Sequence, residues 1–573
     1  MRLEMKKFYT KKLKNLPLNK TVFSLITGLG ISTFWSQGNF TGNIESTFQY
    51  LNNDPIINAL QPPTKGLVNS YMNVFYTHGG FKAGMRVESY LPRIQGYPNR
   101  FDGTGLGYRY VGYSNNKVDV TLGHFYEQFG NGLALRTYED RALGYDNVLD
   151  GARIIFKPFS GLQIKGVYGK QRLSFTEGRV VNSEGIVRAL DGEFHVNETF
   201  KKRLATFPVD VILGASFVSK YQKDDDDALI LPENVGAYGG RVKLQYKNFT
   251  LDGEYIQKEQ DPSLDNGKIY NFGHAAVANF GYSKKGLGFS FSAKSVDNMS
   301  YRSDRNKELQ DAFINFLPAL NKTHTYNLVA TLYPYATQPL GEVAYQADFI
   351  YTLKKGSKLG GKYGTTLGIN ASTTYRPVQH TSGINLSDSS RVMYETRLFD
   401  KSDSLYWRDI NFSITRKLNK KLLLILSYFN ITINNDVAKV SNDATGIISS
   451  HIGVVEASYK INAKHNVRME LQGMFVNKLP NGNINDKGNW ATALIEYTVA
   501  PSYFISFINQ YNYGNPDADK RVNYPNITCG YIHESTRVML SYGRQRAGLF
   551  CVGGVCRFVP ANNGLTLSFT QSF

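Results

Sequence analysis

Apolar and polar residues alternate one by one along much of this chain, and a period of two residues is typical of β-strands. In the final stretch, 564–573, the odd-numbered positions from Leu565 to Phe573 are mostly apolar and the even-numbered positions from Thr566 to Ser572 are Thr or Ser. Such a strand could face the core of a soluble sandwich or the lipid around a transmembrane barrel. Its length suits a barrel, because a tilted strand crosses a bilayer in about 9–11 residues.

The same alternation begins at Asn39 and continues in segments joined by turns. The segment Phe81–Ser89 follows the tight connection Gly79–Gly80 and places apolar side chains opposite Lys82, Arg86 and Glu88. Charged residues on one face of a strand fit a wet lumen as well as a wet outer surface.

Short connections, such as 115–116 and 284–285, alternate with long ones, such as 126–149 and 376–404. Outer-membrane barrels show this asymmetry, with short periplasmic turns and long extracellular loops. We therefore predict an all-β fold, an antiparallel transmembrane barrel of the outer membrane with about 22–26 strands. The number should be even because both chain ends should be periplasmic, but the alternation of turn and loop fails over 297–404 and leaves the parity open.

The N-terminus predicts export. Residues 1–36 combine a lysine-rich segment, an apolar run from Val22 to Phe34 and small or polar residues before Gln37, which is the order of a secretory signal peptide. Cleavage before Gln37 would leave 37–573 as a single barrel domain. No apolar run of about 18 residues follows, so spanning by helices is not expected.

Composition supports strands and export. The chain has 38 Tyr, 35 Phe and 53 Gly, a mixture that favours strands joined by tight turns. Its net charge is +18, and residues 1–36 carry +6 of it, which leaves +12 on the mature chain. We expect contact with outer-membrane lipid and lipopolysaccharide or with anionic solutes. No basic cluster predicts binding to nucleic acid.

The C-terminal strand, which ends on Phe573, resembles the recognition strand of Gram-negative outer-membrane barrels. That resemblance implies that Phe569 and Phe573 form an assembly signal read by the barrel-assembly machinery during insertion.

The segment 126–147 breaks the alternation and combines acidic and basic side chains. As the third extracellular connection it resembles in position the third loop of general porins, which folds inward and narrows the pore. Opposed charges at such a constriction would select solutes by charge. The candidate residues are Glu127, Arg136, Glu139, Asp140, Arg141 and Asp146. The alternative is a surface loop tied by its own ion pairs.

The wider stretch Gly123–Ile154 resembles an uncharacterised family of Bacteroidota outer-membrane barrels, which are porin-like. This resemblance implies the fold and the location, and no established activity.

Residues 305–320 carry the only clear helical pattern, with apolar residues at a spacing of three and four from Leu309 to Leu317 and Pro318 at the end. We predict one short helix here, in or over the barrel, which could plug the lumen, dock a partner or pack on neighbouring loops.

Cysteine usage predicts a disulfide between Cys551 and Cys556, because two glycines between them let a short ring close in an oxidising compartment. Cys529 is expected to be unpaired within a strand. No metal or other cofactor is predicted, although the acidic run 224–227 could bind Ca²⁺ if it is not simply solvated.

These features lead to a non-enzymatic protein, since no hydrolase motif is found. The leading hypothesis is porin-like passage of small solutes, anionic ones among them. The main alternative is an accessory barrel subunit of an outer-membrane secretion, assembly or lipoprotein-export complex, with loops that bind protein partners. An enzyme within the barrel that handles carbohydrate or lipid is the third.

Overall fold

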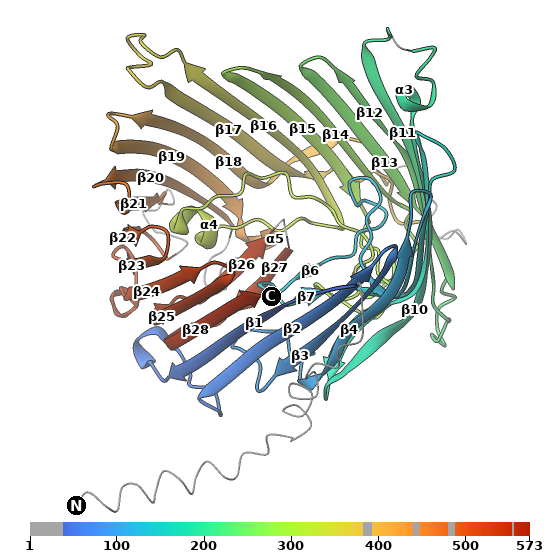
Figure 1. The fold of residues 1–573 in the computed structure, drawn as a ribbon, viewed down its shortest axis with the longest axis horizontal. Coiled ribbons are helices and arrows are strands. Elements are labelled where there is room, and N and C mark those ends of the chain that lie inside the picture. Colours follow the sequence, from blue (N-terminus) through green and yellow to red (C-terminus); the bar gives the residue numbers. More distant parts are fainter. Residues whose placement is uncertain (1–37, 205, 382–391, 439–445, 479–486, 553–554) are drawn as a thin grey trace, which may run out of the picture. The chain divides into compact units, whose positions relative to one another are not determined.

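A computed structural model describes residues 38–573, apart from 205, 382–391, 439–445, 479–486 and 553–554. From Phe40 onward, 24 antiparallel strands form one sheet that closes on itself where β1 pairs with β28 (Figure 1). Closure leaves no unpaired strand edge in this sheet, which is the condition for placing strands in lipid. The predicted signal peptide lies outside the described residues.

The barrel strands follow one another around the ring in chain order. They are β1 (Asn39–Asn52), β2 (Gly66–His78), β3 (Phe81–Tyr90), β4 (Gly103–Ser114), β5 (Val118–Phe125), β8 (Leu149–Phe156), β9 (Leu162–Thr176), β10 (Arg179–His195), β11 (Val209–Tyr221), β12 (Asn234–Tyr246), β13 (Phe249–Lys258), β14 (Gly273–Lys284), β15 (Leu287–Asp297), β16 (Gly341–Leu353), β17 (Thr365–Pro377), β18 (Lys401–Lys417), β19 (Leu422–Asn434), β20 (Ile447–Lys460), β21 (His465–Val476), β22 (Trp490–Val499), β23 (Tyr503–Tyr511), β24 (Asn523–His533), β25 (Thr536–Gln545) and β28 (Asn562–Ser572).

The connections contain a few small elements. Two hairpins pair β6 (Glu139–Asp140) with β7 (Tyr145–Asp146) and β26 (Gly548–Val552) with β27 (Val555–Val559). The helical pieces are η1 (Pro55–Ile57), α3 (Val196–Thr199), α4 (Asn327–Leu332), α5 (Asn435–Ala438) and η2 (Ala518–Lys520). Of the helices in the described ranges, none is both long enough and apolar enough to cross a membrane.

Alternation along the strands sorts side chains between the two faces of the wall. On β3, Met85 and Val87 are exposed on the outer face, whereas Arg86 and Glu88 are buried inside. Late strands behave in the same way, and Leu471 of β21 lies outside beside the buried, inward Glu470. An apolar outer surface on a closed barrel is a lipid-facing surface.

The C-terminal segment forms a strand of the barrel, as its pattern predicted, and this strand closes the barrel. β28 pairs with β25 on one side and with β1 on the other, with Leu567 opposite Phe48 and Ser572 opposite Asn43. Both ends of the barrel therefore lie on the side of the short turns, and the even number of strands is confirmed. The open parity is resolved because β16 and β17 both fall within 297–404 and are joined by residues 354–364.

The predicted helix over 305–320 is wrong. The segment folds back on its own start, with backbone hydrogen bonds from Ser303 to Ala312 and from Ile314 to Tyr301, each 2.9 Å long. Leu309 adopts a positive φ of 54° and is 80% exposed, which no regular buried helix face allows. Contacts with two different partners, described below, replace the single apolar face that the spacing suggested, and tertiary packing outweighs helix propensity.

Candidate functional site

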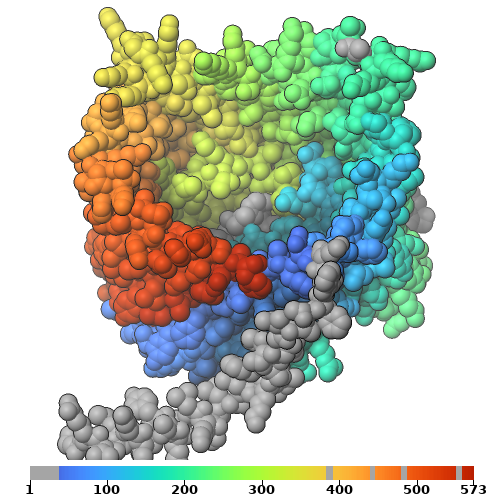
Figure 2. Space-filling view, in the orientation of Figure 1, coloured from blue at the N-terminus to red at the C-terminus, as the bar shows by residue number. Residues whose placement is uncertain are grey.

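Two long connections fold into the barrel. We call residues 126–148, between β5 and β8, the first inner loop and residues 298–340, between β15 and β16, the second inner loop. Figure 1 shows β6, β7 and α4, which belong to these loops, inside the ring of strands. The backbone N–H of Asn131 reaches the carboxylate of Glu254 on β13, a strand far around the ring from β5, at 2.6 Å. In Figure 2, yellow-green atoms of the 300–340 region lie in the hollow of the visible face.

An apolar core joins both inner loops to one part of the wall. Phe129, Leu133 and Leu135 of the first loop and Ile314 and Leu317 of the second pack on inward side chains of β9 to β15. These wall residues are Val167, Val187, Ala189, Val218, Val235, Ala237, Ile256, Ala275, Val277 and Val296. Burial of each large apolar side chain stabilises the contact by about 1.5–3 kcal/mol. The inner loops are therefore packed elements of the fold.

A second apolar core joins α4 and the residues after it to another part of the wall. Leu328, Val329 and Leu332 of α4 and the rings of Tyr333 and Tyr335 pack on β18 to β22. The wall contributes Trp407, Phe429, Ile431, Ile433, Ile448, Ile452, Val454, Met474, Val476 and Trp490. The second inner loop thus crosses the lumen and is anchored at both ends of its path.

The two cores lie toward the long-loop side of the barrel. Val235 is the second residue of β12, Val296 is next to last in β15, and Ile433 is next to last in β19. Near the short turns, inward side chains such as Lys243 and Thr250 are polar and exposed. The lumen is thus packed in its long-loop half and lined by solvated polar groups in its short-turn half.

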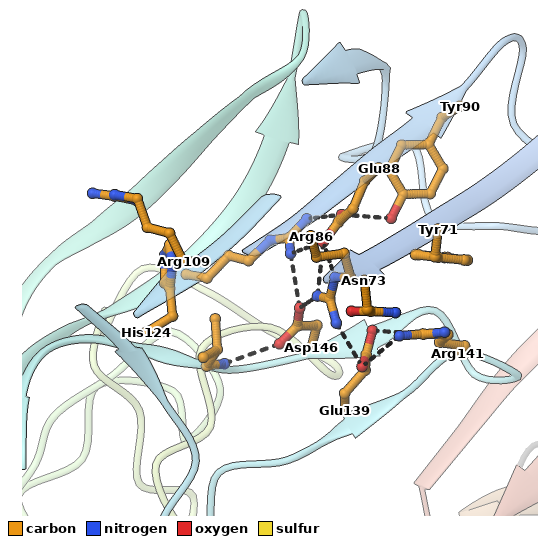
Figure 3. A network of polar contacts seen from close by, with 12 residues as sticks. Tyr71, Asn73, Arg86, Glu88, Tyr90, Arg109, His124, Glu139, Arg141 and Asp146 are labelled. Carbon is orange, nitrogen blue, oxygen red and sulfur yellow. Dashed lines mark hydrogen bonds and ion pairs between the residues drawn. The ribbon is translucent and has the colours of Figure 1, made fainter. Parts of the chain in front are cut away.

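A buried network of charges ties the first inner loop to β3 and β9 (Figure 3). Arg172 on β9 binds Glu88 at 2.7 Å and Asp146 at 2.8 Å. Arg86 on β3 binds Glu88 at 2.7 Å, Asp146 at 3.1 Å and Glu139 at 2.8 Å. Each guanidinium contacts both the wall and the loop, and such charge-assisted bonds are strong and directional.

Arg141 extends the network to β1. Its guanidinium binds Glu45 at 2.6 Å and Glu139 at 3.0 Å. Burial alone would lower the pKa of Arg141, but the carboxylate of Glu139 and, more weakly, that of Glu45 raise it above the ordinary value. Burial raises the pKa of Glu139 above its ordinary value, although the charge of Arg86 lowers it. Arg141 is thus a neutralised cation.

The other predicted site residues of the first inner loop have different kinds of partner. Glu127 binds Lys165 of β9 at 2.8 Å, and Asp140 accepts a hydrogen bond from the backbone of Leu143 at 3.0 Å. Arg136 differs, because within the described ranges it forms no ion pair with a carboxylate. Its guanidinium carbon lies 4.0 Å from the ring centroid of Phe316 and 4.8 Å from that of Tyr138. It is therefore a partly exposed cation held on aromatic rings in the lumen.

Sequence reasoning identified the first inner loop but missed its partners. It placed Arg86 and Glu88 inside the barrel, whereas nothing in the alternation distinguished Arg172. For the second inner loop it predicted a helix at 305–320 in or over the barrel, and it missed the course of the loop and its anchors on the wall. The strand ends near the long loops carry a detectable signal of these anchors: inward positions that should be polar, such as Val235 and Ile433, are apolar.

The cysteine prediction stays a prediction. The backbone places Cys551 of β26 directly opposite Cys556 of β27, while their side chains lie outside the described part of the structure. Cys529 on β24 is free and exposed on the outer face. In the acidic run 224–227, Asp224 accepts hydrogen bonds from the backbone of Asp226 and Leu231.

A closed 24-stranded antiparallel barrel with an apolar outer face and an interior rich in charge defines an outer-membrane β-barrel protein. By sequence the chain belongs to a family of unknown function, DUF6029, whose model matches residues 13–573. The predicted membership in an uncharacterised family is thus confirmed. No protein of curated function matches the chain.

Solved structures with a similar course of the chain are large barrels. The siderophore receptor PirA from Pseudomonas aeruginosa is 9% identical, with 93% of this chain and 80% of that chain covered and a TM-score of 0.38. The outer membrane protein opdK from Pseudomonas aeruginosa is 11% identical, with 93% and 99% covered and a TM-score of 0.34. The outer membrane transporter YddB from Escherichia coli is 7% identical, with 93% and 80% covered and a TM-score of 0.36. At these scores we draw no conclusion about function from the similarity.

Proposed function

We propose that this protein provides a selective passage for small solutes across the outer membrane, narrowed by its two inner loops. The observation that carries the proposal is the division of the lumen: a polar, solvated half near the short turns meets a half in which packed loops leave little room. A barrel without a role in transport would not need a polar, solvated space in its lumen. A wide unselective pore would not need two inner loops with their own apolar cores.

The charge of Arg136 supports passage of anionic solutes. Most other charges that we describe on the first inner loop are neutralised, such as Arg141 by Glu45 and Glu139. An unneutralised guanidinium in a narrow lumen acts strongly on passing ions, because little water screens it. Among the candidates, Arg136 is therefore the residue on which selectivity should depend.

The test is ion conduction by the purified protein in planar lipid bilayers under a salt gradient. The wild-type barrel should conduct, and Arg136→Ala should move the reversal potential toward cation selectivity. Arg136→Lys is the matched control, since it keeps the positive charge at this position, and it should leave the reversal potential close to that of the wild type. Equal shifts for the two variants would contradict the role given to Arg136.

Absence of conduction by the wild-type barrel would overturn the proposal. It would instead favour an accessory barrel in a larger outer-membrane complex, for which a lumen blocked by inner loops is expected. Purification in mild detergent would then identify the protein partners.

A further inference from the structure

A cavity of about 200 Å³ lies between the two inner loops, apart from the charged network. Its walls include Tyr138 and Tyr145 of the first loop and Phe313, Asn315 and Phe316 of the second. Leu309, which is 80% exposed, lines it as well, so the cavity reaches solvent on that side. Both loops are needed to form it.

The cavity is built on a direct pairing of the two loops. Arg136 donates a backbone hydrogen bond to Ile314, and Phe316 donates one to Gly132, each 2.9 Å long. Gly132 has a φ of 93°, and a Cβ there would lie 3.0 Å from the Cβ of Arg136. A glycine is required at this φ, which other residues rarely adopt. The position of the aromatic walls is thus fixed by backbone contacts.

One polar group in the cavity wall has no partner. Asn315 is 4% exposed, and its Nδ2 donates to the carbonyl of Met299 at 3.0 Å. Its Oδ1 is buried and accepts no hydrogen bond from the described residues. A buried acceptor without a donor is costly, and such groups in native proteins are usually satisfied by a ligand or by water.

The arginine in the cavity wall, Arg302, is already engaged. Arg302 donates to the carbonyl of Leu309 at 2.9 Å and binds Asp265 at 3.1 Å, and its guanidinium covers the ring of Phe313. The cavity therefore offers aromatic surface and an unpartnered neutral acceptor, and the charges of Arg302 and Asp265 in its wall are paired with each other. The guanidinium of Arg136 lies on two of its aromatic walls, Phe316 and Tyr138.

We propose that this cavity binds a small aromatic solute that carries a hydrogen-bond donor, of the phenol class, and that the side chain of Asn315 turns on binding so that its buried Oδ1 accepts from that donor. Aromatic walls favour a flat ring in edge or offset contact. The size agrees, because a cavity of about 150 Å³ is known to hold one benzene ring. The claim that this cavity is the recognition site on the route through the barrel rests on the proposed function. The claim that the cavity binds such a solute does not depend on it.

The test uses 4-fluorophenol as probe and fluorine NMR line broadening with the full-length barrel in detergent micelles. Ala336 lines the cavity, and Ala336→Phe should fill it and remove the protein-dependent broadening. Ala228→Phe, at an exposed alanine in the loop 222–233, is the matched control and should bind like the wild type. Micelle partitioning is the same for all three proteins and cancels in the comparison.

The role of the acceptor is tested separately with Asn315→Leu. Loss of one hydrogen bond should weaken binding of 4-fluorophenol about three- to tenfold, and binding of fluorobenzene, which has no donor, should change much less. Equal broadening with wild type and Ala336→Phe would overturn the site, whether or not the barrel conducts ions. Equal losses for both probes on Asn315→Leu would overturn the assignment of a donor-bearing ligand. Conduction without probe binding would leave the proposed function standing and remove this inference alone.

Discussion

Arg172 occupies a buried position in the charged network, where a substitution should be destabilising. It is buried, and it is bound to the buried carboxylates of Glu88 and Asp146. Arg172→Met keeps the length of the side chain but leaves these carboxylates with one fewer cation. We expect the free energy of unfolding to fall by about 3–5 kcal/mol, because breaking a buried pair leaves an uncompensated charge. Urea unfolding in lipid vesicles, followed by tryptophan fluorescence, measures this change.

The control for this prediction is Arg109→Met. The side chain of Arg109 is 53% exposed and lies 3.3 Å from Asp150, so the same substitution should cost less than about 1 kcal/mol. Equal losses for the two variants would show that the network does not stabilise the barrel.

Glu139 makes stability depend on pH in the direction opposite to most paired carboxylates. Its pKa in the folded protein is raised by burial above the ordinary value of 4.5. Between these two pKa values the folded state binds more protons than the unfolded state, so the contribution of Glu139 to stability falls as pH rises through the folded pKa. Glu139→Gln removes this dependence.

Thermal unfolding of both proteins from pH 4 to pH 8 measures the effect. The midpoint of Glu139→Gln relative to that of wild type should increase with pH. Asp140→Asn, which removes a neighbouring carboxylate without an ion pair in the described structure, is the control for the loss of one negative charge from this loop. A relative midpoint that decreases with pH would mean that the ion pairs of Glu139 outweigh its burial.

At the residue scale, sequence could predict which way a side chain points but not what it meets. Alternation on β3 placed Arg86 and Glu88 inside the barrel. Their pairing with Asp146 and Arg172 depends on how a loop of more than twenty residues crosses the lumen, and no local pattern encodes that path. For the six candidates an interior location was one of two interpretations, the other being a surface loop, and the pattern could not predict how each charge is paired.

At the scale of elements, strands were predictable and the inner loops were not. A strand shows a period of two because the wall has two faces throughout its length. In the segment 305–320, Phe313 lines the cavity, whereas the next residue, Ile314, packs in the apolar core with the wall of β9 to β15. Apolar residues at a helical spacing are therefore buried against different partners without forming a helix. Periodicity identifies a face only where a single surface is buried, and this condition fails for a segment packed between a loop and a wall.

The orientation of the barrel in the membrane is a prediction at the same scale. If the long loops are extracellular, loop 222–233 is accessible on intact cells, and Ile230 in it is 81% exposed. Ala228→Lys places a lysine directly after the run Asp224–Asp227, which creates a site for enteropeptidase. We expect that enzyme to cut the variant on intact cells.

The control inserts the same five-residue site into the short turn at 115–117, which should be cut only after the cells are opened. Cleavage of the detergent-solubilised proteins shows that both sites are competent. Cutting of the turn variant alone on intact cells would reverse the orientation.

At the scale of the whole molecule, different interactions stabilise the wall of the barrel and the two inner loops. The wall depends on an unbroken ladder of backbone hydrogen bonds that needs no inner loop. The inner loops depend on apolar cores and on the charged network. The fold class, an outer-membrane barrel, could therefore be predicted from strand patterns alone. The positions of the inner loops in the lumen depend on tertiary contacts between distant segments, which these patterns do not show.

This separation predicts the effect of replacing residues 127–147 of the first inner loop with a short glycine-serine linker. The barrel should still insert, because its ladder is intact, and its single-channel conductance should rise because the lumen widens. Its resistance to urea should fall, since wall residues such as Val235 and Ile256 then face water at a cost of about 25 cal/mol per Å² of apolar surface. Deletion of residues 225–230, in a loop outside both cores, is the control and should change neither quantity. Unchanged conductance after removal of the first inner loop would show that this loop does not obstruct the route, and the constriction would then have to be sought in the second inner loop alone.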